Sequence, residues 1–155
     1  MKNSELAPLH RALTNVGNLK GVKFSYAVAK NMSIIEKELE IIGETKAAKD
    51  FLEFDKQRQE KRLKLLEKHA KKDEDGKPIK KENGDYELES ISKFTKEVSA
   101  LFEIEYEANK EVVDEYQKLL DQEAEIEFHK VKLENVPEDI TTGQMNLIFP
   151  IIDES

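Results

Sequence analysis

Carboxylate and imidazole side chains at alternate positions near the C-terminal end give the best candidate for metal chemistry. Glu125, Glu127 and His129 are spaced two residues apart, so on a strand they share one face. Two carboxylates and one imidazole can hold a divalent cation. The competing interpretation is the solvated edge of a strand that carries charged side chains, and the sequence favours it.

A second acidic run, Asp73-Glu74-Asp75-Gly76, begins like a calcium-binding loop. Counted from Asp73, however, the next acidic ligand position falls on Lys77 and the closing glutamate position falls on Gly84. A turn is therefore expected at this run.

Catalytic motifs are missing from the sequence. His10, His69 and His129 belong to no nucleophile motif, and there is no G-x-S-x-G, P-loop, G-x-G-x-x-G or H-E-x-x-H pattern. With no Cys, thiolate nucleophiles, disulfides and Cys-ligated zinc are excluded. We therefore predict a protein that is not an enzyme, with no catalytic residue, cofactor or metal.

Charge is the strongest pattern in the middle of the chain. Residues 58–81 hold ten basic and five acidic residues, whereas residues 97–127 hold eleven acidic and two basic ones. The basic run could bind phosphate groups of nucleic acid. However, no aromatic residues interleave it, and the net charge of −8 disfavours nucleic acid as the main partner. Pairing with the acidic stretch is favoured. The candidate interaction residues are Arg58, Arg62, Lys64, Lys68, Lys71, Tyr86 and Leu88.

The elements that must position these residues are mainly helices. Apolar residues at helical spacing predict helices over about 4–16 and 22–42, with Ser4 as N-cap of the first. A helical arm is expected over 44–123, interrupted by a β-hairpin at 77–88. Its second helix is expected over about 90–123, with Ser90 as N-cap. Heptad-like spacing in both arms predicts an elongated, coiled-coil-like antiparallel helical hairpin.

The β-hairpin is predicted from Asn83-Gly84, which favours a two-residue loop. That register would oppose Lys81 to Tyr86 and Lys80 to Glu87. After residue 123 a strand is expected over 125–133, with a bulge or change of partner near His129. A short helix then begins at the capping box of Thr141 and Gln144. Ile151 and Ile152 are expected to hold the end of the chain against the body.

The bulk numbers predict a single domain over 1–155. It would comprise N-terminal helices (1–43), the arm (44–123) and a strand with a short helix (124–155). A chain of 155 residues is large enough for a core, and no apolar run suggests a membrane span or signal peptide. We therefore expect a soluble, cytoplasmic protein. Apolar stripes that three helices cannot cover suggest a homo-oligomer.

Two segments carry a resemblance to known sequences. One is Lys20-Gly21-Val22-Lys23-Phe24-Ser25-Tyr26-Ala27-Val28-Ala29-Lys30-Asn31. The other runs from His129-Lys130-Val131-Lys132-Leu133 through Pro137-Glu138-Asp139-Ile140-Thr141-Thr142-Gly143-Gln144 to Ile148-Phe149-Pro150-Ile151-Ile152. With the charged helical middle, they resemble small uncharacterised proteins encoded by tailed bacteriophages and prophages. The resemblance implies a viral protein made in the bacterial host cytoplasm during infection, and it implies no catalytic residues.

The expected function is that of a non-enzymatic protein–protein interaction protein, either a virion-assembly accessory or a binder of a host protein. One alternative is a prefoldin-like chaperone or holdase, because helix, β-hairpin and helix follow that plan. The other alternative is a nucleic-acid-binding accessory protein that uses the basic arm.

Overall fold

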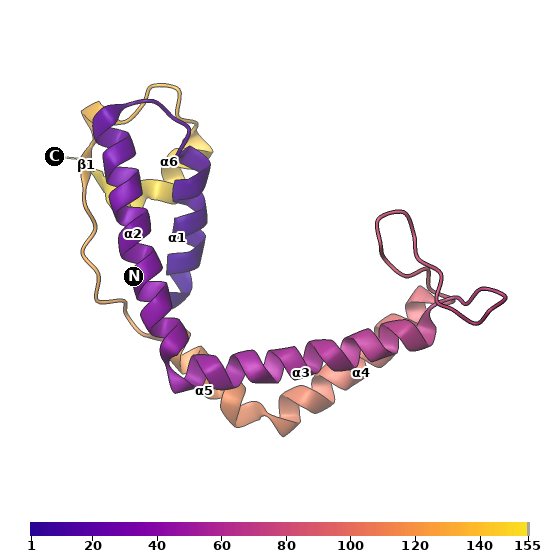
Figure 1. Ribbon diagram of the computed structural model, residues 1–155. Coiled ribbons are helices and arrows are strands. Elements are labelled where there is room, and N and C mark those ends of the chain that lie inside the picture. Colours follow the sequence, from indigo (N-terminus) through magenta and orange to yellow (C-terminus); the bar gives the residue numbers. More distant parts are fainter. Residues whose placement is uncertain (155) are drawn as a thin grey trace. The chain divides into compact units, whose positions relative to one another are not determined.

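The computed structural model describes residues 1–154 and is mainly helical, as predicted (Figure 1). Within these residues there are six α-helices, two short 3-10 helices and one parallel pair of two-residue strands. The chain divides into two compact units. The terminal unit contains Met1–Ala48 and the residues from Gln117 onward, and the arm unit contains Lys49–Tyr116.

Two helices from the N-terminal part of the chain form most of the core of the terminal unit. These are α1 (Asn3–Val16) and α2 (Val22–Glu44). The apolar side chains of α1 recur every three or four residues and so share one face. The buried apolar side chains larger than alanine on α1 and α2 are Leu6, Leu9, Leu13, Val16, Phe24, Val28, Ile35 and Ile42. The predicted helical spacing is therefore confirmed.

The first helix begins one residue earlier than predicted, and Ser4 is not its N-cap. Lys2 is the N-cap residue, and its backbone N–H donates to the Glu5 carboxylate at 2.6 Å. A glutamate in the first turn can satisfy a free N–H group there, so the helix forms without the Ser4 hydroxyl.

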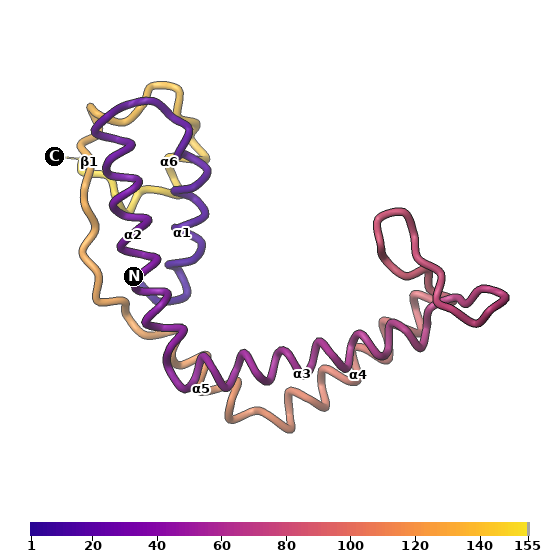
Figure 2. The backbone as a smooth tube through the Cα atoms, in the orientation of Figure 1, coloured from indigo at the N-terminus to yellow at the C-terminus, as the bar shows by residue number. Residues whose placement is uncertain are grey.

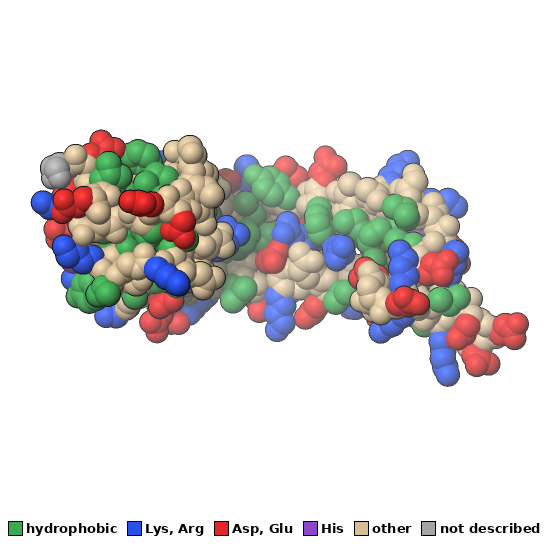
Figure 3. Space-filling model, turned by 90° about the horizontal axis from the view of Figure 1, so that it is seen from above, with side chains coloured by type: hydrophobic (Ala, Val, Ile, Leu, Met, Phe, Trp, Pro, Cys, Tyr) green, Lys and Arg blue, Asp and Glu red, His purple; other side chains and the backbone are tan. Residues whose placement is uncertain are grey.

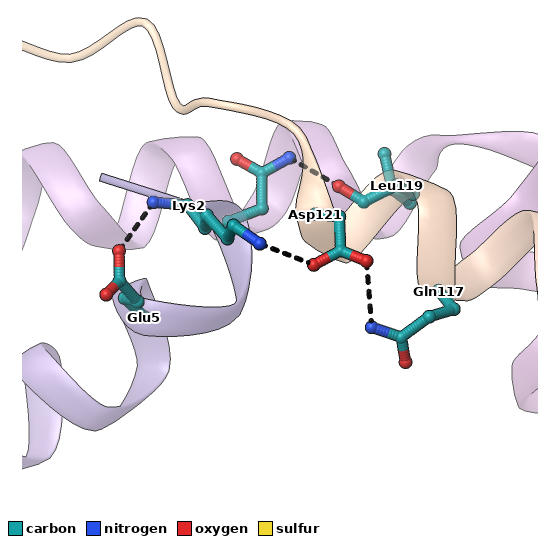
Figure 4. Close-up of polar contacts among 6 residues, drawn as sticks. Lys2, Glu5, Gln117, Leu119 and Asp121 are labelled. Atoms are coloured by element: carbon teal, nitrogen blue, oxygen red, sulfur yellow. Dashed lines mark hydrogen bonds and ion pairs between the residues drawn. The ribbon is translucent and has the colours of Figure 1, made fainter.

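The N-terminal residues are fastened to the end of α5 (Lys110–Asp121). The Lys2 ammonium donates to Asp121 at 2.9 Å, and Asn3 Nδ2 donates to the carbonyl of Leu119 at 2.9 Å (Figure 4). The Lys2 hydrogen bond is the main cause that raises the pKa of Lys2 and lowers the pKa of Asp121. These contacts close the terminal unit by joining its two chain segments.

The predicted strand over 125–133 is wrong for most of its length. Only β1 (Val131–Lys132) is a strand, and it pairs in parallel with β2 (Ile152–Asp153). Two residues before β1, the side-chain amide of buried Asn31 hydrogen-bonds to both backbone polar groups of His129. Nδ2 donates to the carbonyl and Oδ1 accepts from the N–H, each at 2.8 Å. The side chain of Asn31 thus makes the hydrogen bonds to His129 that a neighbouring strand would otherwise make.

The end of the chain follows the sequence more closely. The capping box of Thr141 and Gln144 begins α6 (Thr142–Ile148), as predicted. Two 3-10 helices, η1 (Leu133–Asn135) and η2 (Phe149–Ile151), flank it in the chain. Ile151 and Ile152 are buried, so the expectation that they hold the chain against the body is confirmed.

The arm unit is built from α3 (Lys46–His69) and α4 (Ile91–Ala108), which lie alongside each other in Figures 1 and 2. Lys61 pairs with Glu105 at 2.6 Å, and Lys68 pairs with Glu97 at 2.8 Å. The Phe51 ring stacks on Tyr116 at 4.1 Å between centroids. Only three apolar side chains of this unit are buried among the described residues: Phe54, Ala70 and Phe94.

The predicted single helix over 90–123 is wrong, because it is broken at Asn109. There the backbone has φ −120° and ψ 24°, and the side-chain amide donates to the carbonyl of Glu105 at 2.9 Å. Asn side chains compete with helical hydrogen bonding in this way. The predicted N-cap is confirmed, since the Ser90 hydroxyl accepts from the N–H of Lys93.

The segment between α3 and α4 has antiparallel bridges but no assigned strand, and its register differs from the predicted one by one residue. Lys80 faces Tyr86, and the N–H of Lys81 donates to the carbonyl of Asp85. The loop therefore has three residues, with Gly84 at φ +86°. A turn followed by a left-handed Gly is the usual three-residue hairpin loop.

Among the described residues 1–154, no helix is both long and apolar enough to cross a membrane.

Candidate functional site

The candidate site is a groove of about 720 Å³ within the arm unit, here called the arm groove. Three elements line it: the second half of α3, the segment 81–88, and the first turns of α4. The lining residues are Arg62, Leu63, Leu66, Lys81, Asp85, Tyr86, Glu87, Leu88, Ile91, Phe94 and Thr95.

Backbone hydrogen bonds hold the segment 81–88 beside the end of α3. The N–H of Lys71 donates to the carbonyl of Glu87 at 2.7 Å, and the N–H of Glu89 donates to the carbonyl of His69 at 2.9 Å. Tyr86 and Leu88 are consequently half-buried in the groove wall. Backbone hydrogen bonds, more than buried apolar packing, therefore hold this wall of the groove in place before a partner binds.

Large apolar side chains remain open to solvent in the arm groove. Leu63 is 50% exposed and Ile91 is 71% exposed. Ile91 is the first residue after the N-cap Ser90, where the helix has only begun and few neighbours can cover it. Phe94, one turn later, is buried and closes the floor.

The charges of the groove are mixed. Two basic and two acidic side chains line it: Arg62, Lys81, Asp85 and Glu87. The ammonium of Lys71 hydrogen-bonds to Glu87 and so lowers the pKa of that carboxyl group. Glu87 is thereby paired with Lys71. The guanidinium of Arg62 at the α3 wall is a suitable donor for a partner's carboxylate.

The structure brings together three of the seven residues that the sequence offered as interaction residues: Arg62, Tyr86 and Leu88. The others lie outside the groove. Lys68 and Lys71 are paired with glutamates, and the Lys68 hydrogen bond is the main cause that lowers the pKa of Glu97. Lys64 is exposed on α3 and lines no part of the groove.

Arg58 has a structural position instead of an exposed one. Its guanidinium hydrogen-bonds to Asp55 and lies over the rings of Phe54 and Phe102, at 5.4 and 4.7 Å from their centroids. Such a cation–π arrangement binds α3 to α4, so Arg58 is engaged within the unit.

Sequence reasoning missed the apolar half of the groove. In the sequence, Leu63 and Leu66 lie three residues apart, and so do Ile91 and Phe94, which is typical of the apolar side of a helix. Their exposure depends on where α4 begins and on the register of the segment 77–88. The available signal was the N-cap Ser90 directly before an apolar residue.

Within residues 1–154, no group of three or more His, Asp or Glu side chains is arranged so that it could hold a metal ion. Glu125 and Glu127 lie before β1 in a segment without strand structure. Of the histidines, His10 pairs with Glu36 at 2.9 Å, and Nε2 of His69 lies 3.2 Å from the Glu97 carboxylate.

Fold and groove define a helical protein with an open apolar–polar recess. Comparison of the chain with protein-family models, with curated proteins and with solved structures found no match.

Proposed function

We propose that this is a non-enzymatic protein–protein interaction protein that binds its partner through the arm groove. The observation that carries the proposal is the presence of exposed Leu63 and Ile91 beside half-buried Tyr86 and Leu88, with Arg62 at the same wall. Interface centres are enriched in aromatic residues and Arg. Hydrophobic side chains also interrupt the charged surface in Figure 3.

The energetic gain comes from covering these side chains. Full burial of a Leu or Ile side chain stabilises by about 1.5–3 kcal/mol. Since Leu63 is 50% exposed and Ile91 is 71% exposed, a partner that covers both gains about 2–4 kcal/mol from them. An apolar side chain of the partner, next to a carboxylate that meets Arg62, fits this groove.

The architecture proposed with this function is an antiparallel helical hairpin, coiled-coil-like, that presents the groove on an arm. The resemblance of both chain ends to bacteriophage and prophage proteins supports a partner in an infected bacterial cell, of either phage or host origin. Virion assembly and modulation of a host protein are the two roles consistent with such a partner.

Site-specific photo-crosslinking tests the proposal with a matched control on the same unit. A photoreactive phenylalanine analogue replaces Ile91 in the groove, or Ile104, which is 65% exposed outside it. We expect one discrete adduct from position 91 in infected cells, and we expect Leu63→Ser to abolish it. Equal adducts from both positions, or none from position 91, would contradict the proposal.

A holdase is the second candidate, because exposed apolar side chains also lie outside the groove. Leu52 and Ile104 are 69% and 65% exposed, and unfolded clients bind such dispersed surfaces. Suppression of the aggregation of heat-denatured citrate synthase, reduced equally by Leu52→Ser and Leu63→Ser, would favour this function. The nucleic-acid alternative lacks comparable support, because Lys68 and Lys71 are engaged with Glu97 and Glu87.

A further inference from the structure

A second groove, of about 420 Å³, lies in the terminal unit and is here called the terminal groove. The first turns of α2 form one side of it, and the segment around β1 forms the other. Figures 1 and 2 show that segment running alongside α2. Its lining includes Val22, Lys23, Tyr26, His129, Lys130 and Lys132.

The terminal groove is basic although the protein is acidic. Three lysines line it, and no Asp or Glu is in the lining, whereas the chain as a whole carries a formal charge of −8. Lys130 donates to the carbonyl of Pro150 at 2.6 Å. The ammonium groups of Lys23 and Lys132 have no ion pair or hydrogen bond within the described residues 1–154 and remain available for a ligand.

The floor of the terminal groove is apolar and open. Val22 is 88% exposed and Tyr26 is 59% exposed, so both side chains are open to a ligand. The ring of His129 meets the Tyr26 ring edge-on, at 5.3 Å between centroids and 87° between planes. The aromatic pair gives a rigid platform for an apolar side chain.

Two hydrogen bonds from a buried side chain hold this aromatic pair in place. Asn31, fully buried on α2, holds the N–H and the carbonyl of His129 at 2.8 Å each. The segment carrying the His129 ring and the three residues after it is thus set relative to Tyr26 before any ligand arrives. Preorganisation of this kind lowers the entropic cost of binding.

We propose that the terminal groove binds an acidic peptide segment of a partner protein. An apolar or aromatic side chain of that segment packs on Val22 and Tyr26, and flanking carboxylates meet the ammonium groups of Lys23 and Lys132. Charge complementarity carries the assignment of the occupant. The proposal goes beyond the arm groove and does not depend on it.

Nucleic acid fits these observations less well than an acidic peptide. Affinity for a phosphate backbone comes from many simultaneous contacts, about 6–10 in typical binders. The terminal groove offers two uncommitted ammonium groups within a chain of charge −8. Two charges with an apolar platform match a short peptide that carries an anchor side chain.

Peptide display on the full-length protein tests the proposal. The probe is a library of random 12-residue peptides, and selected peptides are resynthesised for titration by fluorescence anisotropy. We expect enrichment of Asp and Glu around Leu, Ile, Phe or Tyr. The double variant Lys23→Glu/Lys132→Glu should weaken the selected peptide by about tenfold or more.

The control variant Arg11→Glu/Lys37→Glu makes the same charge change at exposed positions of α1 and α2 outside the groove. It should leave the affinity within about twofold. Tyr26→Phe should keep binding and Tyr26→Ala should weaken it, with thermal unfolding confirming that all variants fold.

Any of these results would overturn the proposal: no enriched peptides, enrichment of basic peptides, equal effects of the groove and control variants, or displacement of the selected peptide by oligo(dT) as competitor. Concentration-dependent self-association abolished by Lys23→Glu/Lys132→Glu would also overturn it, since the occupant would then be a second copy of this chain.

Discussion

Replacement of Asn31 by Ala tests how the terminal unit is held together. Asn31 is 0% exposed and makes two hydrogen bonds of 2.8 Å to the backbone of His129. Alanine leaves the N–H and the carbonyl of His129 without these partners. Each such group costs about 1–3 kcal/mol when it stays unsatisfied in the interior. Because His129 is only half-buried, we expect a total loss of about 2–4 kcal/mol.

Two measurements check this expectation. Urea unfolding followed by far-UV circular dichroism gives the free energy of unfolding of the protein, with contributions from the helices of both units. Hydrogen–deuterium exchange of a peptide covering residues 124–133 reports on the N–H of His129, which Asn31 Oδ1 protects in the native protein. Exchange in that peptide should accelerate more than elsewhere in the unit.

Asn146→Ala is the matched control, because Asn146 is exposed on α6. Surface substitutions of this kind change stability by about 0.5 kcal/mol or less. Asn31→Asp keeps the acceptor, loses the donor and buries a charge, so it should destabilise at least as much as Asn31→Ala. A loss below about 1 kcal/mol for Asn31→Ala, with unchanged exchange around His129, would refute the reasoning.

Three further predictions concern the capping box, the loop glycine and an ion pair. Thr141→Ala should cost about 1 kcal/mol of unfolding free energy, because the Thr141 hydroxyl accepts from the N–H of Gln144; urea unfolding measures it. Gly84→Ala should cost about 1–2 kcal/mol of unfolding free energy in the arm unit, because Gly84 has φ +86°, a left-handed backbone conformation that alanine disfavours. Since no atom lies within 4 Å of the added Cβ, this cost is backbone strain without a steric clash. The Lys68 hydrogen bond lowers the pKa of Glu97 below its ordinary value of 4.5, so the native state gains stability above that pH and loses it as the pH falls through the lowered pKa. Glu97→Gln should flatten this acid dependence in urea titrations between about pH 3 and 6, and an unchanged slope would contradict the assignment.

The core helices of the terminal unit could be read from the sequence because their signal is local. Leu6, Leu9, Leu13 and Val16 recur at the helical period, and a chain segment with one apolar face has one way to bury it. The capping box at Thr141 was readable for the same reason, since it depends on side chains three residues apart.

What sequence reasoning missed depends on contacts between distant residues. At His129 the backbone N–H and carbonyl bond to the side chain of Asn31, 98 residues away, instead of to a neighbouring strand. The break at Asn109 was hidden because Asn occurs both inside helices and at their ends. Asn83-Gly84 predicted a hairpin turn, but one-residue register shifts are decided by the partner segment, and here Lys71 bonds to Glu87.

The two grooves lead to a prediction about coupling. No residue lines both, and each is lined from one unit alone. Substitutions that share no partners act additively to within about 0.3–0.5 kcal/mol. We therefore expect Lys23→Glu/Lys132→Glu to leave the crosslink at position 91 intact.

The reciprocal measurement completes this test. Leu63→Ser/Ile91→Ser should leave the affinity for the selected acidic peptide within about twofold, and the four-residue combination should lose both activities without further loss of stability. These outcomes would show that each groove binds its ligand independently of the other. A change above about threefold at one groove, caused by substitution in the other, would mean that the units respond to ligands as one body.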